Sequence, residues 1–138
     1  MTQRIKALKG IITKEMKMVA RKEGVSPEWL QEKIVSGRTV IPANRNHRGL
    51  KPIGIGEGLR IKVNTNLGTS SDHVDLEEEL KKLEVSIQAG TDTVMDLSTG
   101  GDIDGIRKEI IRHSPVPVGT VPIYEAAIGA AKKRKGLP

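Results

Sequence analysis

Three residues that could line a ligand site, Asn66, Met95 and Tyr124, recur along the chain at a constant interval of 29 residues. The amide of Asn66 can donate and accept hydrogen bonds, and the hydroxyl of Tyr124 can do the same at the end of an apolar ring. Each residue lies at or just beyond a short apolar run, and a helix-like stretch follows each run. Because side chains at the carboxyl ends of parallel strands converge where ligands bind, the spacing predicts a shared site.

Two of these residues also allow a structural interpretation. Asn66 lies close to Gly68, and asparagine beside glycine is typical of a turn. Tyr124 follows Pro122 and could pack as an ordinary amphipathic side chain. Considered residue by residue, both interpretations stay open.

The segment at 93–102 is a second candidate for chemistry. It places Ser98, Thr99 and two glycines before a predicted helix, as a phosphate-binding loop does, but no Gly-Lys-Ser/Thr of a Walker motif follows. Asp96 and Asp102 could form an acid–base pair or ligate a metal, although a helix cap is the favoured role for Asp102. We therefore predict neither a catalytic residue nor a metal ligand in this chain.

Composition excludes several kinds of site. The chain has no cysteine, so its 138 residues can hold no disulfide, thiolate nucleophile or cysteine-ligated cluster. Its three histidines lack the spacing of a metal site. No apolar run approaches the roughly 20 residues of a membrane span, and no secretory signal is recognisable, so we expect a cytoplasmic protein without membrane contact.

Charge is distributed unevenly. Residues 1–60 contain 13 Lys and Arg against 5 Asp and Glu, whereas residues 61–138 contain 10 against 12. A basic half can bind nucleic acid, but it can equally be a solvated lysine-rich surface. No aromatic side chain is interleaved with the charges, which favours the second interpretation over nucleic-acid binding.

The predicted elements fall into two groups. Apolar residues at helical spacing predict one helix over 2–23, and Ser26-Pro27 begins a second that ends at Gly37. A loop rich in Gly, Asn and Pro follows. We therefore predict an N-terminal helical domain and loop over residues 1–57.

Three strand–helix units are predicted after this loop. The strands are expected at 59–65, 93–97 and 116–123. The first helix has an apolar stripe at Leu76, Leu80, Leu83 and Ile87 and a cap within 69–72, and the third helix spans 125–135 up to Gly136. A closed barrel of eight units takes about 250 residues. The predicted fold class is α/β, with a small helical N-terminal domain followed by the first three βα units of an incomplete (βα)₈ barrel at residues 58–138.

Five segments together resemble the phosphomethylpyrimidine synthase family of thiamine biosynthesis, in its shorter prokaryotic form. The resemblance covers essentially the whole chain, and the spacing between the three strand-end segments is kept. The segments are residues 41–47, 54–56, 63–68, 89–100 and 114–124.

The resemblance implies an activity. The family is a radical S-adenosylmethionine lyase of carbon–carbon bonds that converts aminoimidazole ribotide into hydroxymethylpyrimidine phosphate, with a [4Fe–4S] cluster and zinc. It implies an N-terminal domain, a (βα)₈ barrel and a C-terminal cluster-binding segment that completes the partner's site in a homodimer. Residues matching Asn66, Met95 and Tyr124 contact the substrate in that family.

The resemblance also sets a limit. The family's cluster cysteines, zinc-binding histidines and later substrate-binding residues have no counterpart in these 138 residues. We therefore expect an N-terminal fragment or half of a split enzyme, inactive by itself and completed by a homodimer or a complementing C-terminal chain. The alternatives are a non-catalytic ligand- or partner-binding module derived from the family and a basic nucleic-acid-binding domain.

Overall fold

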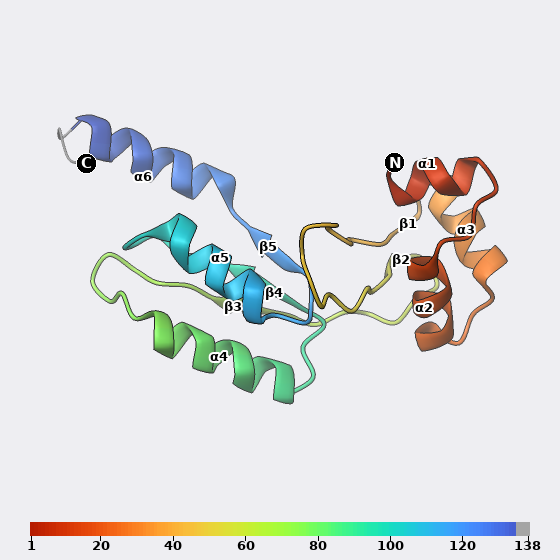
Figure 1. Cartoon of the computed structure of the whole chain (residues 1–138), viewed down its shortest axis with the longest axis horizontal. Coiled ribbons are helices and arrows are strands. Elements are labelled where there is room, and N and C mark those ends of the chain that lie inside the picture. Colours follow the sequence, from red (N-terminus) through yellow and green to blue (C-terminus); the bar gives the residue numbers. More distant parts are fainter. Residues whose placement is uncertain (135–138) are drawn as a thin grey trace. The chain divides into compact units, whose positions relative to one another are not determined.

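The computed structural model of the chain describes residues 1–134 and divides it into two compact units. The first unit comprises Met1–Lys62 and the second begins at Val63. Figure 1 shows that the first unit is mainly helical and that the second combines helices with a sheet. No helix within residues 1–134 is long and apolar enough to cross a membrane.

Three helices form most of the first unit: α1 (Gln3–Leu8), α2 (Lys14–Glu23) and α3 (Pro27–Val35). The prediction of one helix over 2–23 is wrong. Gly10 adopts a left-handed φ of 75°, and the hydroxyl of Thr13 accepts a hydrogen bond from the Met16 amide, which begins a new helix. As a result, Leu8 is 57% exposed instead of lying on one apolar face with Met16.

The core of the first unit lies between α2 and α3. Met16 and Leu30 are fully buried there, and the indole of Trp29 packs at its margin. A short antiparallel ribbon of β1 (Thr39–Val40) and β2 (Ile55–Gly56) completes the unit. The Ser26 hydroxyl caps α3 by accepting a hydrogen bond from the Trp29 amide, as predicted.

The first strand of the second unit begins later than predicted. The strand expected at 59–65 is β3, at Asn64–Leu67. Leu59 packs instead against the core of the first unit, and Lys62 Nζ lies 2.8 Å from Glu23 Oε1 with both side chains 5% exposed. Because Leu59 and Lys62 make these contacts within the first unit, β3 begins only at Asn64.

The second unit is built on a parallel sheet of three strands in the order β3-β4-β5. The strands β4 (Thr93–Asp96) and β5 (Val118–Thr120) follow β3, and α4 (Leu76–Gln88) and α5 (Ile103–His113) connect them. The predicted α/β class and the parallel order of the strands are confirmed.

Apolar side chains from α4 and α5 cover one face of this sheet. The buried cluster contains Leu67 and Val94 from the strands and Leu83, Ile106 and Ile110 from the helices. Side chains alternate between the two faces of a strand, so the residues beside Leu67 and Val94 lie on the opposite face. Because the helices cover one face, only strand residues on the opposite face are accessible to a ligand.

The helix starts of the second unit were only partly predicted. Asp102 caps α5 as predicted, because its carboxylate accepts a hydrogen bond from the Gly105 amide. The cap of α4 is Asp75, and the prediction of a cap within 69–72 is wrong. The last helix, α6, spans Pro122–Arg134, and the predicted stop at Gly136 lies outside the described residues.

Candidate functional site

Asn66 and Met95 are direct neighbours on adjacent parallel strands. They are register partners in β3 and β4, and Met95 is in turn the register partner of Gly119 in β5. Register partners point to the same side of a sheet. Because Leu67 and Val94 lie beneath the helices, Asn66 and Met95 share the face that α4 and α5 leave uncovered.

A chain of hydrogen bonds orients the amide of Asn66. The Thr93 hydroxyl donates to Asn64 Oδ1 at 2.7 Å, and Asn64 Nδ2 donates to Asn66 Oδ1 at 3.1 Å. Since the amide oxygen of Asn66 is already an acceptor within the protein, its Nδ2 group is the part oriented to donate to a ligand. The site therefore favours a ligand oxygen or unprotonated nitrogen at this position.

Tyr124 is placed differently from the prediction. The third strand ends at Thr120 and not near Ile123, because Pro122 begins α6 with a φ that suits the first helical turn. Tyr124 therefore lies in the first turn of α6, with its amide bonded to the Val121 carbonyl and its side chain 46% exposed. The structure brings Asn66 and Met95 together on adjacent strands, whereas Tyr124 lies outside the sheet, in the first turn of α6.

The loops that follow β3 and β4 are joined to each other. The Thr69 amide donates to Ser98 Oγ at 3.2 Å, and the Thr69 hydroxyl donates to the Gly100 carbonyl at 2.7 Å. Gly100 lies so close to the Ser70 carbonyl that a Cβ there would clash. The polar groups that resembled a phosphate loop thus hold two strand ends in place.

Asp96 is an internal ion-pair partner and forms no pair with Asp102. Its carboxylate is 1% exposed, with Oδ1 accepting from the Ser98 amide at 3.0 Å and Oδ2 lying 3.6 Å from Arg107 Nε. Arg107 Nη1 also lies 2.8 Å from Glu125 Oε2 in α6. The sequence analysis missed Arg107 and Glu125, because no local spacing indicates a pair between different helices.

Glu79 is a second buried carboxylate near a strand end. It is 1% exposed, and its Oε2 accepts from the Gly68 amide at 2.7 Å while Oε1 accepts from Lys82 Nζ at 2.8 Å. Hydrogen bonds to Glu79 and Glu78 raise the pKa of Lys82 above its usual value. The contact between Glu79 and the Gly68 amide was not predicted from the sequence.

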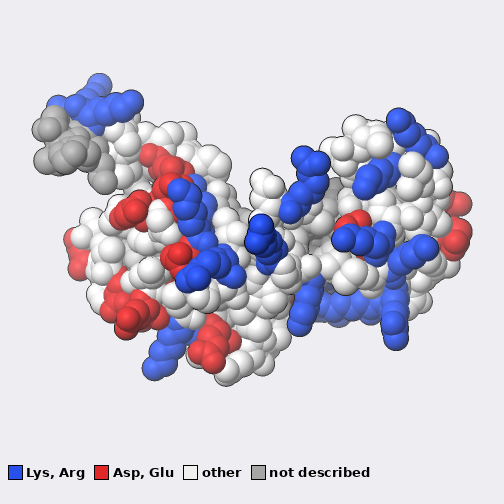
Figure 2. All heavy atoms as spheres, in the orientation of Figure 1, with Lys and Arg blue, Asp and Glu red and all other residues white. Residues whose placement is uncertain are grey.

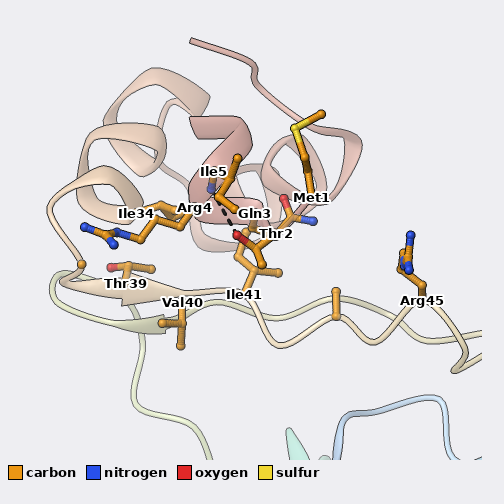
Figure 3. A pocket seen from close by; sticks show the side chains of 12 residues that line it. Met1, Thr2, Gln3, Arg4, Ile5, Ile34, Thr39, Val40, Ile41 and Arg45 are labelled. Atoms are coloured by element: carbon orange, nitrogen blue, oxygen red, sulfur yellow. Dashed lines mark hydrogen bonds between the residues drawn. The ribbon is translucent and has the colours of Figure 1, made fainter. Parts of the chain in front are cut away.

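Two hollows of the first unit contain none of the predicted site residues. One, of about 600 Å³, lies beside α1 and β1 and has Arg4 and Arg45 among mostly apolar walls (Figure 3). Figure 2 shows Lys and Arg gathered over the first unit, whereas both signs of charge are mixed over the second. The basic half expected from the sequence is therefore a surface of the helical unit.

The residues described here do not fit an iron–sulfur cluster or a zinc ion. The sequence has no cysteine, and residues 1–134 contain no group of three or more His, Asp or Glu placed to hold a metal. The amide of Asn66 beside the thioether of Met95 offers a hydrogen-bond donor next to an apolar, polarisable group.

Comparison with known proteins identifies the relatives of this chain. It is 60% identical over 135 residues to the phosphomethylpyrimidine synthase of Thermus thermophilus, an alignment that covers 97% of this chain and 31% of that protein. It is 56% identical over 133 residues to the phosphomethylpyrimidine synthase of Carboxydothermus hydrogenoformans, with coverages of 96% and 31%. The chain thus spans about a third of the length of the curated relatives it matches. A sequence model of the Radical SAM ThiC family matches residues 2–138, and the chain belongs to that family.

Proposed function

We propose that this chain forms part of the substrate site of a phosphomethylpyrimidine synthase, in which Asn66, Met95 and Tyr124 contact aminoimidazole ribotide. The main support is the register of β3 and β4, which sets Asn66 beside Met95 on the uncovered face of the sheet. The 60% identity to a phosphomethylpyrimidine synthase supports the choice of ligand.

Each of the three residues has a distinct role in this proposal. Asn66 donates from Nδ2 to an acceptor atom of the ribotide, because Asn64 already uses the amide oxygen. The thioether of Met95 is apolar and polarisable, so it packs against the flat imidazole ring. The hydroxyl of Tyr124 hydrogen-bonds a polar group of the ligand from the first turn of α6.

The sheet of the second unit is proposed to be the first three βα units of a (βα)₈ barrel. The three strands are parallel and adjacent in chain order, and in the described part of the chain β3 and β5 each pair along one edge. A hollow of about 420 Å³ at the free edge of β3 is lined by Asn66 and by Lys81, Lys82 and Val85 from α4. Unpaired edges and an uncovered face require further strands, from the same protein, a homodimer partner or a complementing chain.

The proposal separates ligand binding from catalysis. The conversion of the ribotide to hydroxymethylpyrimidine phosphate is radical chemistry of a carbon–carbon lyase that uses S-adenosylmethionine, a [4Fe–4S] cluster and zinc in this family. The 138 residues contain no cysteine to ligate a cluster, so we expect them alone to bind the ribotide without converting it. We also propose a cytoplasmic location, because the family is one of thiamine-biosynthesis enzymes.

Calorimetric titration of the chain with aminoimidazole ribotide tests the proposal. We expect weak binding that Asn66→Ala and Met95→Ala reduce, while Met18→Ala, a change at a 50% exposed methionine of the first unit, leaves it unchanged. Equal affinity in all four proteins would contradict the site. Formation of product by the purified chain would contradict the separation of binding from catalysis.

A partner-binding module remains the second candidate, because the free edges of β3 and β5 offer unpaired backbone groups to another chain. Sedimentation of the chain distinguishes the candidates. Association that ribotide does not influence, together with no ribotide binding, would favour the module. Steeply salt-dependent binding to DNA or RNA would instead favour a nucleic-acid function for the basic unit.

A further inference from the structure

Arg107 in α5 connects the end of a strand to the helix that contains Tyr124. Its Nε lies 3.6 Å from Oδ2 of Asp96, the last residue of β4, and its Nη1 lies 2.8 Å from Oε2 of Glu125 in α6. The Asp96 side chain is 1% exposed and that of Arg107 is 20% exposed. The guanidinium therefore connects three elements, with a buried carboxylate on the Asp96 side and a 45% exposed carboxylate on the Glu125 side.

The Asp96 end of this connection is held by hydrogen bonds. Asp96 Oδ1 accepts from the Ser98 amide, and Ser98 Oγ accepts from the Thr69 amide in the loop after β3. The carboxyl ends of β3 and β4 and the side chain of Arg107 thus belong to one hydrogen-bonded and ion-paired group. Through Arg107, the position of Glu125 is therefore tied to these strand ends.

The α6 end of this connection is the ion pair between Arg107 and Glu125. The first turn of α6 has little apolar anchoring, because Ile123 is 69% exposed and Tyr124 is 46% exposed. Glu125 is adjacent to Tyr124 in the sequence, so an ion pair that fixes Glu125 also fixes the backbone from which the tyrosine extends.

We propose that Arg107 is a positioning residue that holds Tyr124 at the substrate site through its two carboxylate partners, Asp96 and Glu125. The role of Tyr124 in ligand binding rests on the proposed function. The placement of Tyr124 by Arg107 rests on the two ion pairs alone. Arginine suits this task because its planar guanidinium can face two acids at once, with Nη1 beside Glu125 and Nε facing Asp96, whereas a lysine offers one compact charge.

Fluorine NMR offers a direct readout, because Tyr124 is the one tyrosine of the sequence and fluorotyrosine labelling gives a signal from that residue alone. The variants are Arg107→Met, Arg107→Lys and Glu125→Gln. The matched control is Arg112→Met, which removes an arginine of the same helix that pairs with Glu109. Amide exchange at Tyr124 and ribotide affinity are measured on each protein.

Arg107→Met and Glu125→Gln are expected to shift the fluorine signal towards that of free fluorotyrosine and to accelerate exchange of the Tyr124 amide. Arg107→Lys should show both effects to a smaller extent, and Arg112→Met should show neither. Ribotide affinity should fall by about fivefold or more in Arg107→Met, the lower end of typical coupling between sites.

A fluorine signal and an exchange rate unchanged in Arg107→Met and Glu125→Gln would overturn the proposal. If Arg107→Met unfolds the unit, as loss of the buried Val94 and Ile110 methyl signals would reveal, the exposed Glu125→Gln change decides the matter. Absence of ribotide binding in the wild-type chain would refute the proposed function, while the fluorine and exchange data would still test the placement of Tyr124.

Discussion

The thioether of Met95 lies over Gly119, its register partner in β5. A Cβ at Gly119 would lie 3.0 Å from both Sδ and Cε of Met95, which is closer than ordinary van der Waals contact. The absence of a side chain at Gly119 therefore defines where the Met95 thioether rests. This places the thioether across two strands on the uncovered face of the sheet.

Substitution of Gly119 should move Met95 without unfolding the protein. Gly119→Ala requires the flexible end of Met95 to shift by a few tenths of an ångström, so we expect a change in stability below about 1 kcal/mol. The methyl signal of Met95 should shift, and ribotide binding should weaken. Gly129→Ala is the matched control, because nothing lies within 4 Å of a Cβ there. An unchanged Met95 signal in Gly119→Ala would contradict the described contact.

Removal of the Glu79 carboxylate should destabilise the second unit. Glu79→Ala leaves the half-buried Gly68 amide without its 2.7 Å acceptor, and a buried donor left without a partner costs about 1–3 kcal/mol, so we expect a loss towards the lower end of that range. Urea unfolding measures the change. Glu77→Ala, at an exposed position of the same helix, should alter the free energy of unfolding by less than about 0.5 kcal/mol. Equal effects of the two substitutions would show that the Gly68 contact contributes nothing.

Glu57 should make the first unit sensitive to acid. Hydrogen bonds from Lys33 and from Arg38 lower the pKa of Glu57 from 4.5 to about 2. Because the folded-state pKa is below the unfolded value, this contribution is complete above pH 4.5 and is lost as the pH falls towards 2. Thermal unfolding of Glu57→Gln should therefore depend less on pH across this window than the wild type. A Glu57→Gln protein whose unfolding temperature depends on pH as steeply as that of the wild type would refute the prediction.

The orientation of Asn66 should depend on Asn64. Asn64→Ala removes the donor to Asn66 Oδ1 and frees the amide to rotate. Since a hydrogen bond of this kind contributes about 1 kcal/mol, ribotide affinity should fall by roughly fivefold. Calorimetry checks this, with Asn46→Ala in the first unit as control. Unchanged affinity in Asn64→Ala would mean that Asn64 does not determine which amide group meets the ligand.

Local signals predicted the elements whose causes are local. The apolar stripe of α4 and the Asp102 cap of α5 were correct because each depends on residues within a few turns of one helix. The strand expected at 59–65 was misplaced because Leu59 and Lys62 are held by the first unit, a tertiary effect that periodicity does not contain. The helix expected over 2–23 failed because Gly10 and Thr13 favour a break within an otherwise helical pattern.

The candidate site was predictable to a similar extent. The constant spacing anticipated that Asn66 and Met95 meet, because register follows the repeat of strand–helix units. The position of Tyr124 in α6, and the ion pairs of Arg107, depend on where β5 ends and on which helix faces pack together. Those features arise from tertiary structure, so residue spacing alone does not reveal them.

The most direct test of the account is a titration of the chain with aminoimidazole ribotide, followed by the methyl signals of methionine and the fluorine signal of Tyr124. The account predicts that the signals of Met95 and Tyr124 move together with a single dissociation constant. It predicts that the signals of Met16 and Met18, in α2 of the first unit, stay fixed. Movement at Met16 or Met18 with none at Met95 would contradict the proposed ribotide site.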